Sequence, residues 1–363
     1  MDIEDFEKAS QACVAALEEA VDRDWTVAAG SLTWSCWQTA DHLVDVIFSY
    51  AFQIAARPEK SDLAFDELRA APEAPASHLV NGLLAVSRMM TSTMRSSPSG
   101  VTIPWHGQPI DLRSWAAMGT REIILHTHDI ATGLGVPYAP EADLAAAVLA
   151  FAHPDADPGH DPWASLVRAS GRPFGQEETA VRAAATEERR SRLSPPGAVE
   201  GLVSNFESGE VISSFGSGWL ASSDRLQGGS STADIAVVDG GAAGTNRSLR
   251  VAGELVEGPG FQWAGALFSP GPAPMATANL WGKRFIRFWA MGDGRTCLLW
   301  SLAETGGGRP AGASHFRAGP DWRPYEFELR NMGTDGSDLS GLMFVAWRPT
   351  GPFSFQIDEV RID

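Results

Sequence analysis

The sequence is poor in cysteine and lysine, has no net positive charge, and contains no long apolar run. Its three cysteines, Cys13, Cys36 and Cys297, are an odd number without a Cys-x-x-Cys pair. They therefore indicate neither a disulfide framework nor a thiolate zinc site. No apolar run is long enough to cross a bilayer, and the first six residues are acidic where a signal peptide needs positive charge. We expect a cytoplasmic protein without a membrane partner.

The formal net charge of −17 at pH 7 argues against a nucleic-acid partner. Binding through phosphates needs a basic surface that displaces counterions. The acidity is concentrated in residues 1–200, which carry 28 Asp and Glu against 15 Lys and Arg. We interpret this charge as a contribution to solubility.

Glycine divides the 363 residues into two parts, because 11 of the 37 glycines precede residue 201 and 26 follow it. The first part is rich in the helix formers Ala, Leu and Glu, and the second is rich in Gly, Ser, Phe and Trp, which favour turns and strands. The boundary is predicted at residues 194–198. We expect an α+β protein of two domains, a helical bundle over residues 1–195 and an all-β sandwich over 200–363.

Apolar residues at helical spacing predict four long helices in the first part. They cover residues 3–22, from 31 or 33 to 56, 77–96, and from 111 to 133 or 135. Asp111 suits an N-cap, and Gly133 or Gly135 suits a C-cap. Shorter helices are predicted at 140–151 and 161–170, and the charged residues 176–192 fit a helix or a tether. Four long amphipathic helices with modest connections form a bundle.

Three side chains of this bundle form a candidate metal site. Glu122 and His126 are four residues apart, so they emerge from one face of their helix. If His42 reaches them from a neighbouring helix, a divalent ion gains three ligands and keeps an open position, as in catalytic sites. The spacing alone also fits an ordinary surface pair and a hydrogen-bonded core histidine.

The segments around these residues resemble the mycothiol-dependent maleylpyruvate isomerase family of DinB-like four-helix bundles. The resemblance is carried by residues 25–45, with His42, and by residues 111–135, with Glu122 and His126. It implies that these three residues hold a metal, which activates mycothiol or another small thiol as a thiolate. The 25 arginines against three lysines suit the high-GC genomes in which that thiol occurs. Two nitrogens and one carboxylate suit zinc, and also iron, nickel or manganese.

Three further residues are candidates around this site. Asp129 follows His126 by three residues and Asp45 follows His42 by three, so either carboxylate could orient a ligand imidazole. Arg88 could present a guanidinium to a carboxylate of the substrate or the thiol. Solvent-exposed positions on the helix surfaces are the alternative for all three.

Four segments of the second part, residues 205–207, 224–232, 288–295 and 355–362, resemble the galactose-binding-like jelly rolls, in particular the complex I intermediate-associated protein 30 type. Short apolar runs alternate with glycine-rich turns from Val203 onward, as in a β-sandwich. Seven of the 13 tryptophans lie here, where exposed indoles would stack on a sugar and buried ones would fill the core. Carbohydrate binding, protein contact and pairing of subunits stay open for this part.

These observations predict a metal-dependent S-transferase or isomerase that acts on a small electrophilic metabolite with a small thiol. One alternative is a non-catalytic binding or assembly protein that works through the jelly roll. Another is a metal-dependent enzyme that uses water or a substrate oxygen in place of the thiol.

Overall fold

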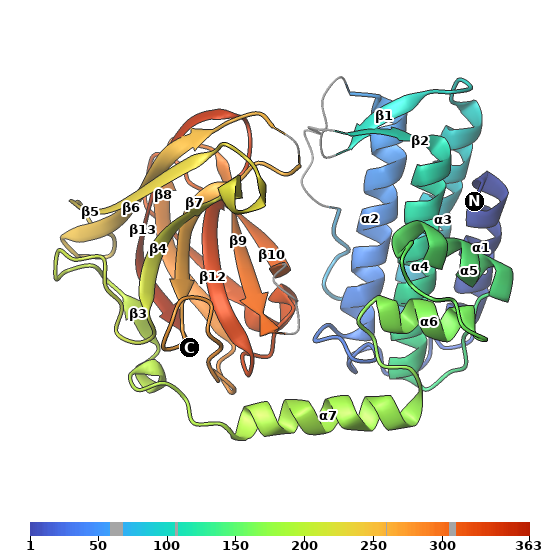
Figure 1. Cartoon of the computed structure of the whole chain (residues 1–363), viewed down its shortest axis with the longest axis horizontal. Coiled ribbons are helices and arrows are strands. Elements are labelled where there is room, and N and C mark those ends of the chain that lie inside the picture. The colour runs from blue at the N-terminus through green and yellow to red at the C-terminus, as the bar shows by residue number, and fades with distance from the viewer. Residues whose placement is uncertain (59–67, 106–107, 259, 305–309) are drawn as a thin grey trace. The chain divides into compact units, whose positions relative to one another are not determined.

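The chain divides into a helical unit and a β-unit. The computed structural model describes residues 1–58, 68–105, 108–258, 260–304 and 310–363. Within them, the two compact units are Met1–Arg182 and Ala183–Asp363. The first is built of helices and the second mainly of strands (Figure 1), so the fold is α+β with two domains, as the sequence predicts. The division falls inside helix α7 (Gly175–Ser191), before the predicted boundary at residues 194–198.

Four long helices form a bundle in the helical unit, and further helices follow it. The bundle consists of α1 (Ile3–Glu18), α2 (Cys36–Ala56), α3 (Ala76–Ser96) and α4 (Leu112–Leu134). They are followed by α5 (Ala142–Ala152), α6 (Pro162–Ala169) and α7. A hairpin that the sequence pattern did not predict, β1 (Thr102–Trp105) and β2 (Gln108–Asp111), precedes α4. Within the described residues, no helix combines the length and the apolar character needed to cross a membrane.

Local capping explains where the two site-bearing helices begin and end. Asp111 accepts a hydrogen bond from the Ser114 amide, and Gly135 ends α4 at a φ of +66°, which confirms both predicted caps. Helix α2 begins later than the predicted Ser31 or Thr33, at Cys36. Ser35 and Gln38 there form a reciprocal capping box that satisfies two backbone donors.

The packing of the bundle makes α2 and α4 neighbours. Helix α2 packs against α3 and α4, and α1 packs against the same two helices. Large buried side chains fill the space between them, including Phe6, Leu43, Ile47 and Trp115. Gly133 on α4 has no room for a Cβ, which would lie 2.3 Å from the carbonyl oxygen of Ala28. The segment before α2 therefore lies directly against α4.

The β-unit is a sandwich of two antiparallel sheets with jelly-roll character. The five-stranded sheet has the order β10-β9-β12-β7-β4, and the six-stranded sheet runs β11-β8-β13-β6-β5 with β3 paired to β13. The strands are β3 (Leu202–Ser204), β4 (Gly218–Ser223), β5 (Thr232–Asp239), β6 (Arg247–Leu255), β7 (Ala264–Ser269), β8 (Phe285–Gly292), β9 (Thr296–Ala303), β10 (Pro310–Arg317), β11 (Arg323–Glu328), β12 (Leu339–Ala346) and β13 (Gly351–Ile362). Short 3-10 turns, among them η4 (Leu329–Met332), connect some of them.

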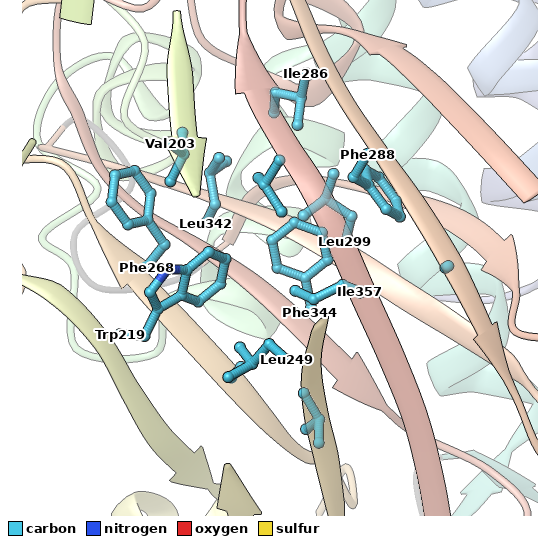
Figure 2. Packing of buried hydrophobic residues seen from close by; sticks show 14 of the residues in the cluster. Val203, Trp219, Leu249, Phe268, Ile286, Phe288, Leu299, Leu342, Phe344 and Ile357 are labelled. Carbon is cyan, nitrogen blue, oxygen red and sulfur yellow. The ribbon is translucent and has the colours of Figure 1, made fainter. Parts of the chain in front are cut away.

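The core of the sandwich is aromatic and aliphatic. Figure 2 shows Trp219, Phe268, Phe288 and Phe344 between the sheets, and the ring of Phe344 lies 4.9 Å from that of Phe288 and 5.7 Å from that of Trp219. A second apolar cluster, with Trp263, Trp300, Met343 and Val345, lies on the other face of the five-stranded sheet. Both faces of this sheet are therefore apolar.

One predicted strand, residues 261–268, begins later than expected. Strand β7 starts at Ala264, because Phe261 packs instead against Trp300 and Trp347. Aromatic packing takes precedence here over strand pairing.

Candidate metal centre

The structure brings His42, Glu122 and His126 together. His42 comes from α2, and the other two residues come from the facing turns of α4. One ligand atom from each of the three lies within 4.8 Å of the others, and all three side chains are partly buried. This cluster is the one group of potential metal ligands found among the described residues.

The distances fit a small divalent cation. The Nε2 atom of His126 lies 3.4 Å from Oε2 of Glu122. Two ligand atoms about 2.1 Å from a tetrahedral zinc ion lie roughly 3.4 Å apart, so this pair already has the required separation. The imidazole rings of His42 and His126 have centroids 5.2 Å apart and stand edge to face, at 85°. Two imidazoles and one carboxylate, with 12% of the Glu122 and His126 side chains exposed, fit a site that is open on one side.

Asp129 and Arg172 hold the imidazole of His126. The Nδ1 atom of His126 lies 3.1 Å from Oδ2 of Asp129, a hydrogen bond that leaves Nε2 for a metal. Arg172, in the loop after α6, grips the same carboxylate with two short hydrogen bonds of 2.8 Å from Nε and Nη2. The side chain of Asp129 is 2% exposed, so water contributes little to the stabilisation of its negative charge. His126 and Arg172 therefore provide most of that stabilisation.

Burial and neighbouring charges shift the pKa values of Glu122 and His126 in opposite directions. Burial alone raises the pKa of Glu122, but hydrogen bonding and charge from His126 and Arg121 outweigh it and hold that pKa well below its usual range. Burial alone lowers the pKa of His126, but the hydrogen bonds to Asp129 and Glu122 outweigh it and raise that pKa. Without a metal, these contacts favour the charged imidazole, with the Nδ1 proton directed at Asp129 and the Nε2 proton directed at Glu122. A divalent cation bound at Nε2 would replace the proton there.

Three side chains at the site were not predicted from the sequence: Arg121, Trp34 and Arg172. Arg121 donates a hydrogen bond to Oε1 of Glu122, and Trp34 places its ring 5.0 Å from that of His42. Adjacent residues on a helix do not normally face each other, so spacing gave no reason to select Arg121. Trp34 and Arg172 lie outside helices. Trp34 contacts His42 and Arg172 contacts Asp129 only because of the tertiary fold, which helical spacing does not predict.

Asp45 and Arg88 are placed differently from Asp129. Asp45 accepts a hydrogen bond of 2.7 Å from the backbone amide of Leu68, so one carboxylate oxygen fixes the chain after α2. Arg88 is exposed on α3, a helix that packs against α1 and α2. Within the described residues, no hydrogen bond or ion pair joins Arg88 to the three candidate ligands. The roles suggested for Asp45 and Arg88 at the metal stay predictions.

The other histidine of this segment, His128, points away from the cluster. Its ring packs edge to face on Trp163, with centroids 5.3 Å apart. On a helix of 3.6 residues per turn, side chains two residues apart point about 160° away from each other.

The cysteines of the chain do not offer a reactive thiolate. Cys13 and Cys36 in the helical unit are buried, and desolvation raises the pKa of each thiol to about 12. Cys297 is buried in the β-unit, and its pKa is raised as well. A thiolate nucleophile at the candidate metal centre would have to come from a bound small molecule.

Comparisons with known proteins give only distant structural likenesses. No protein-family model matches the chain, and no curated protein is significantly similar to it. Among solved structures, a family 11 carbohydrate-binding module from Clostridium thermocellum in complex with a mixed-linked tetrasaccharide is 12% identical. It covers 47% of this chain and 96% of the module, with a TM-score of 0.33. A module from Caldicellulosiruptor saccharolyticus in complex with mannohexaose is 16% identical and covers 36% and 81%, with a TM-score of 0.27. This is a distant likeness to jelly-roll sandwiches.

Proposed function

We propose that the helical unit is a metal-dependent enzyme that transfers a small thiol to an electrophilic metabolite or uses the thiol to isomerise it. The observation that carries the proposal is the convergence of His42, Glu122 and His126 within 4.8 Å. Zinc is the metal that this donor set suits best, and iron, nickel or manganese accept the same ligands.

The chemistry follows from the donor set and its surroundings. A divalent cation held by these residues would favour the anion of a thiol beside it, and the thiolate is the nucleophile. Asp129 would keep the Nε2 atom of His126 directed toward the cation. Arg121 would keep one oxygen of Glu122 occupied and leave the other as a ligand.

The thiol is assigned to a separate small molecule for two reasons. The cysteines of the chain are buried and have raised pKa values, so they are poor nucleophiles at neutral pH. The motif around His42, Glu122 and His126 resembles that of mycothiol-dependent isomerases, which supports mycothiol as the thiol.

Elemental analysis combined with a thiol assay tests the proposal. The full chain is purified without added metal, and its metal content is compared with that of His42→Ala and His128→Ala. Both variants lose an imidazole of the helical unit, but His128 packs on Trp163 outside the cluster. We expect about one metal per chain in the wild type and in His128→Ala, and loss of it in His42→Ala.

Consumption of an electrophilic probe is then measured with and without a small thiol. Turnover that needs both the metal and the thiol supports the proposal. Turnover that needs the metal alone would assign the site to water or a substrate oxygen. A metal-free wild type with no turnover would leave binding through the β-unit as its function and contradict the proposal.

A further inference from the structure

A surface tryptophan of the β-unit lines a small cavity. Trp281 is 44% exposed, and no other tryptophan in the described parts of the chain is classed as exposed. The cavity has a volume of about 260 Å³. Its walls come from residues 281–284 before β8, from residues 328–330 at the junction of β11 and η4, and from Asp335.

The indole of Trp281 is held in place. The guanidinium of Arg190 lies 3.8 Å from the centre of the ring, and Arg190 is fixed by a 2.8 Å ion pair with Asp335. The backbone amide of Trp281 donates to the side chain of Asn279 over 2.9 Å. A large apolar ring that is exposed and already ordered costs little conformational entropy when a ligand binds. Such a ring is suited to stacking against the apolar face of a sugar.

The cavity is positively charged in a strongly acidic protein. Lys283, Arg284 and Arg330 line it, with Glu328 and Asp335 as the acidic groups. Three cations against two carboxylates leave a formal charge of +1, whereas the whole chain carries −17. A local excess of positive charge of this kind selects an anionic ligand.

The two carboxylates already have cationic partners. Asp335 binds Arg190, and Glu328 lies 3.4 Å from Arg284. The ammonium of Lys283 donates to the carbonyl oxygen of Val199, a neutral acceptor that leaves the charge uncompensated. Lys283, with Arg284 next to it in the chain, is therefore placed to attract a carboxylate.

The size of the cavity limits the ligand. Pockets for drug-sized molecules measure about 300 to 1,000 Å³, so 260 Å³ accommodates roughly one sugar ring. The negative charge of the rest of the chain disfavours a long polyanion. We propose that this cavity binds a sugar acid, with the pyranose ring stacked on Trp281 and its carboxylate facing Lys283 and Arg284.

Calorimetric titration of the full chain with galacturonic acid, and with its neutral methyl ester, tests the site. We expect saturable binding of the acid, at least about fivefold tighter than that of the ester, which matches a single partly exposed charge pair. Added salt should reduce this difference. Equal binding of acid and ester, or no saturable binding of either, would overturn the proposal.

Three variants locate the binding. Trp281→Ala should weaken binding of the acid by about tenfold, whereas Trp281→Phe should retain most of it, because the phenyl ring still stacks. Lys283→Glu should weaken it by about tenfold. Arg250→Glu makes the same change of charge sign at an exposed position of β6 outside the cavity and should bind as the wild type does.

Wild-type affinity in Trp281→Ala, or equal losses in Lys283→Glu and Arg250→Glu, would contradict the assignment. The titrations are repeated after removal of metal with a chelator. Since the cavity and the candidate metal centre belong to different units, binding of the sugar acid should not change. The outcome is thus independent of the metal-dependent function proposed above.

Discussion

The two units of this chain bury carboxylates in different surroundings. In the β-unit, Asp224 accepts hydrogen bonds from the amide and hydroxyl of Ser231, and Asp358 accepts from the Ala242 amide and the Thr245 hydroxyl. In the helical unit, buried Asp129 and partly buried Glu122 face imidazole and guanidinium groups. In the β-unit, neutral donors to these carboxylates fix loops and strand ends. In the helical unit, charged groups surround the carboxylates, and a metal cation could take the place of one positive charge.

The buried carboxylates of the β-unit contribute to stability, whereas those of the helical unit form the candidate metal site. Neutral hydrogen bonds and an apolar core stabilise the β-unit without requiring a ligand. The helical unit concentrates two carboxylates around one imidazole, an arrangement that is costly unless a proton or a metal neutralises it. The comparison predicts that changes in one unit leave the property of the other intact.

The largest expected effect is on the core of the β-unit. Phe344→Ala removes a fully buried ring that contacts Phe288 and Trp219, and should lower the free energy of unfolding of this unit by about 3 to 5 kcal/mol. Urea unfolding followed by tryptophan fluorescence measures the loss. Metal content should stay unchanged. A loss of metal in this variant would contradict the expectation that the two units behave independently.

The next effect concerns a ligand of the helical unit. His42→Ala should weaken metal binding by more than about a hundredfold, or about 2.7 kcal/mol, since loss of a residue that merely supports a ligand already costs about 10- to 100-fold. Competition with a chelating dye measures the affinity. The unfolding transition of the β-unit should not move. An affinity equal to that of the wild type would show that the metal binds elsewhere.

A smaller effect is expected from the support of His126. Arg172→Ala leaves Asp129 buried without its guanidinium partner, and should weaken metal binding by about 10- to 100-fold. The absorption spectrum of bound cobalt should shift, because the imidazole is no longer held in one orientation. Arg172→Lys should recover part of the affinity. Arg168→Ala on α6, which removes an exposed pair with Glu178, serves as the control and should leave the spectrum unchanged.

The smallest effect is a reversal of pH dependence by the metal. In the metal-free protein, the raised pKa of His126 stabilises the helical unit below the ordinary histidine pKa of about 6.5, and this contribution is lost as pH rises through the raised value. The lowered pKa values of Glu122 and Asp129 give stability that is present above their ordinary values and is lost in acid. In a His128→Ala background, which removes the opposing effect of that histidine's lowered pKa, the metal-free unit should therefore be more stable at about pH 5.5 than at pH 8.

With the metal bound, the order should reverse, because a proton on His126 competes with the cation. Thermal unfolding at the two pH values, with and without a chelator, measures both trends. A metal-free unit whose stability rises from pH 5.5 to pH 8 would contradict the arrangement of charges described here.

Local signals predicted the helices and the three clustered residues, and long-range contacts limited the rest. Asp111 and Gly135 act within one turn of α4, so their roles follow from sequence alone. The helical period likewise placed Glu122, His126 and Asp129 on one face. Arg172 was not predicted, because it reaches Asp129 from 43 residues away through a loop.

The strand pattern in the sequence predicted the all-β class of the β-unit, but it did not predict which side chains are exposed. Trp263 and Trp281 belong to similar apolar and glycine-rich surroundings in the sequence, yet Trp263 is buried and Trp281 is exposed. Exposure depends on which chain segments cover a strand end, and these segments are distant in sequence. The boundary of β7 was missed for a similar reason, since Phe261 packs on residues of distant strands.

X-ray absorption at the zinc edge of the zinc-loaded full chain tests the central claim most directly. We predict nitrogen and oxygen neighbours at about 2.0 to 2.1 Å with a contribution from two imidazoles, and one sulfur neighbour at about 2.3 Å after addition of a small thiol. In His42→Ala this pattern should be lost. A spectrum without imidazole neighbours, or one that the thiol leaves unchanged, would contradict a thiol-activating metal centre formed by His42, Glu122 and His126.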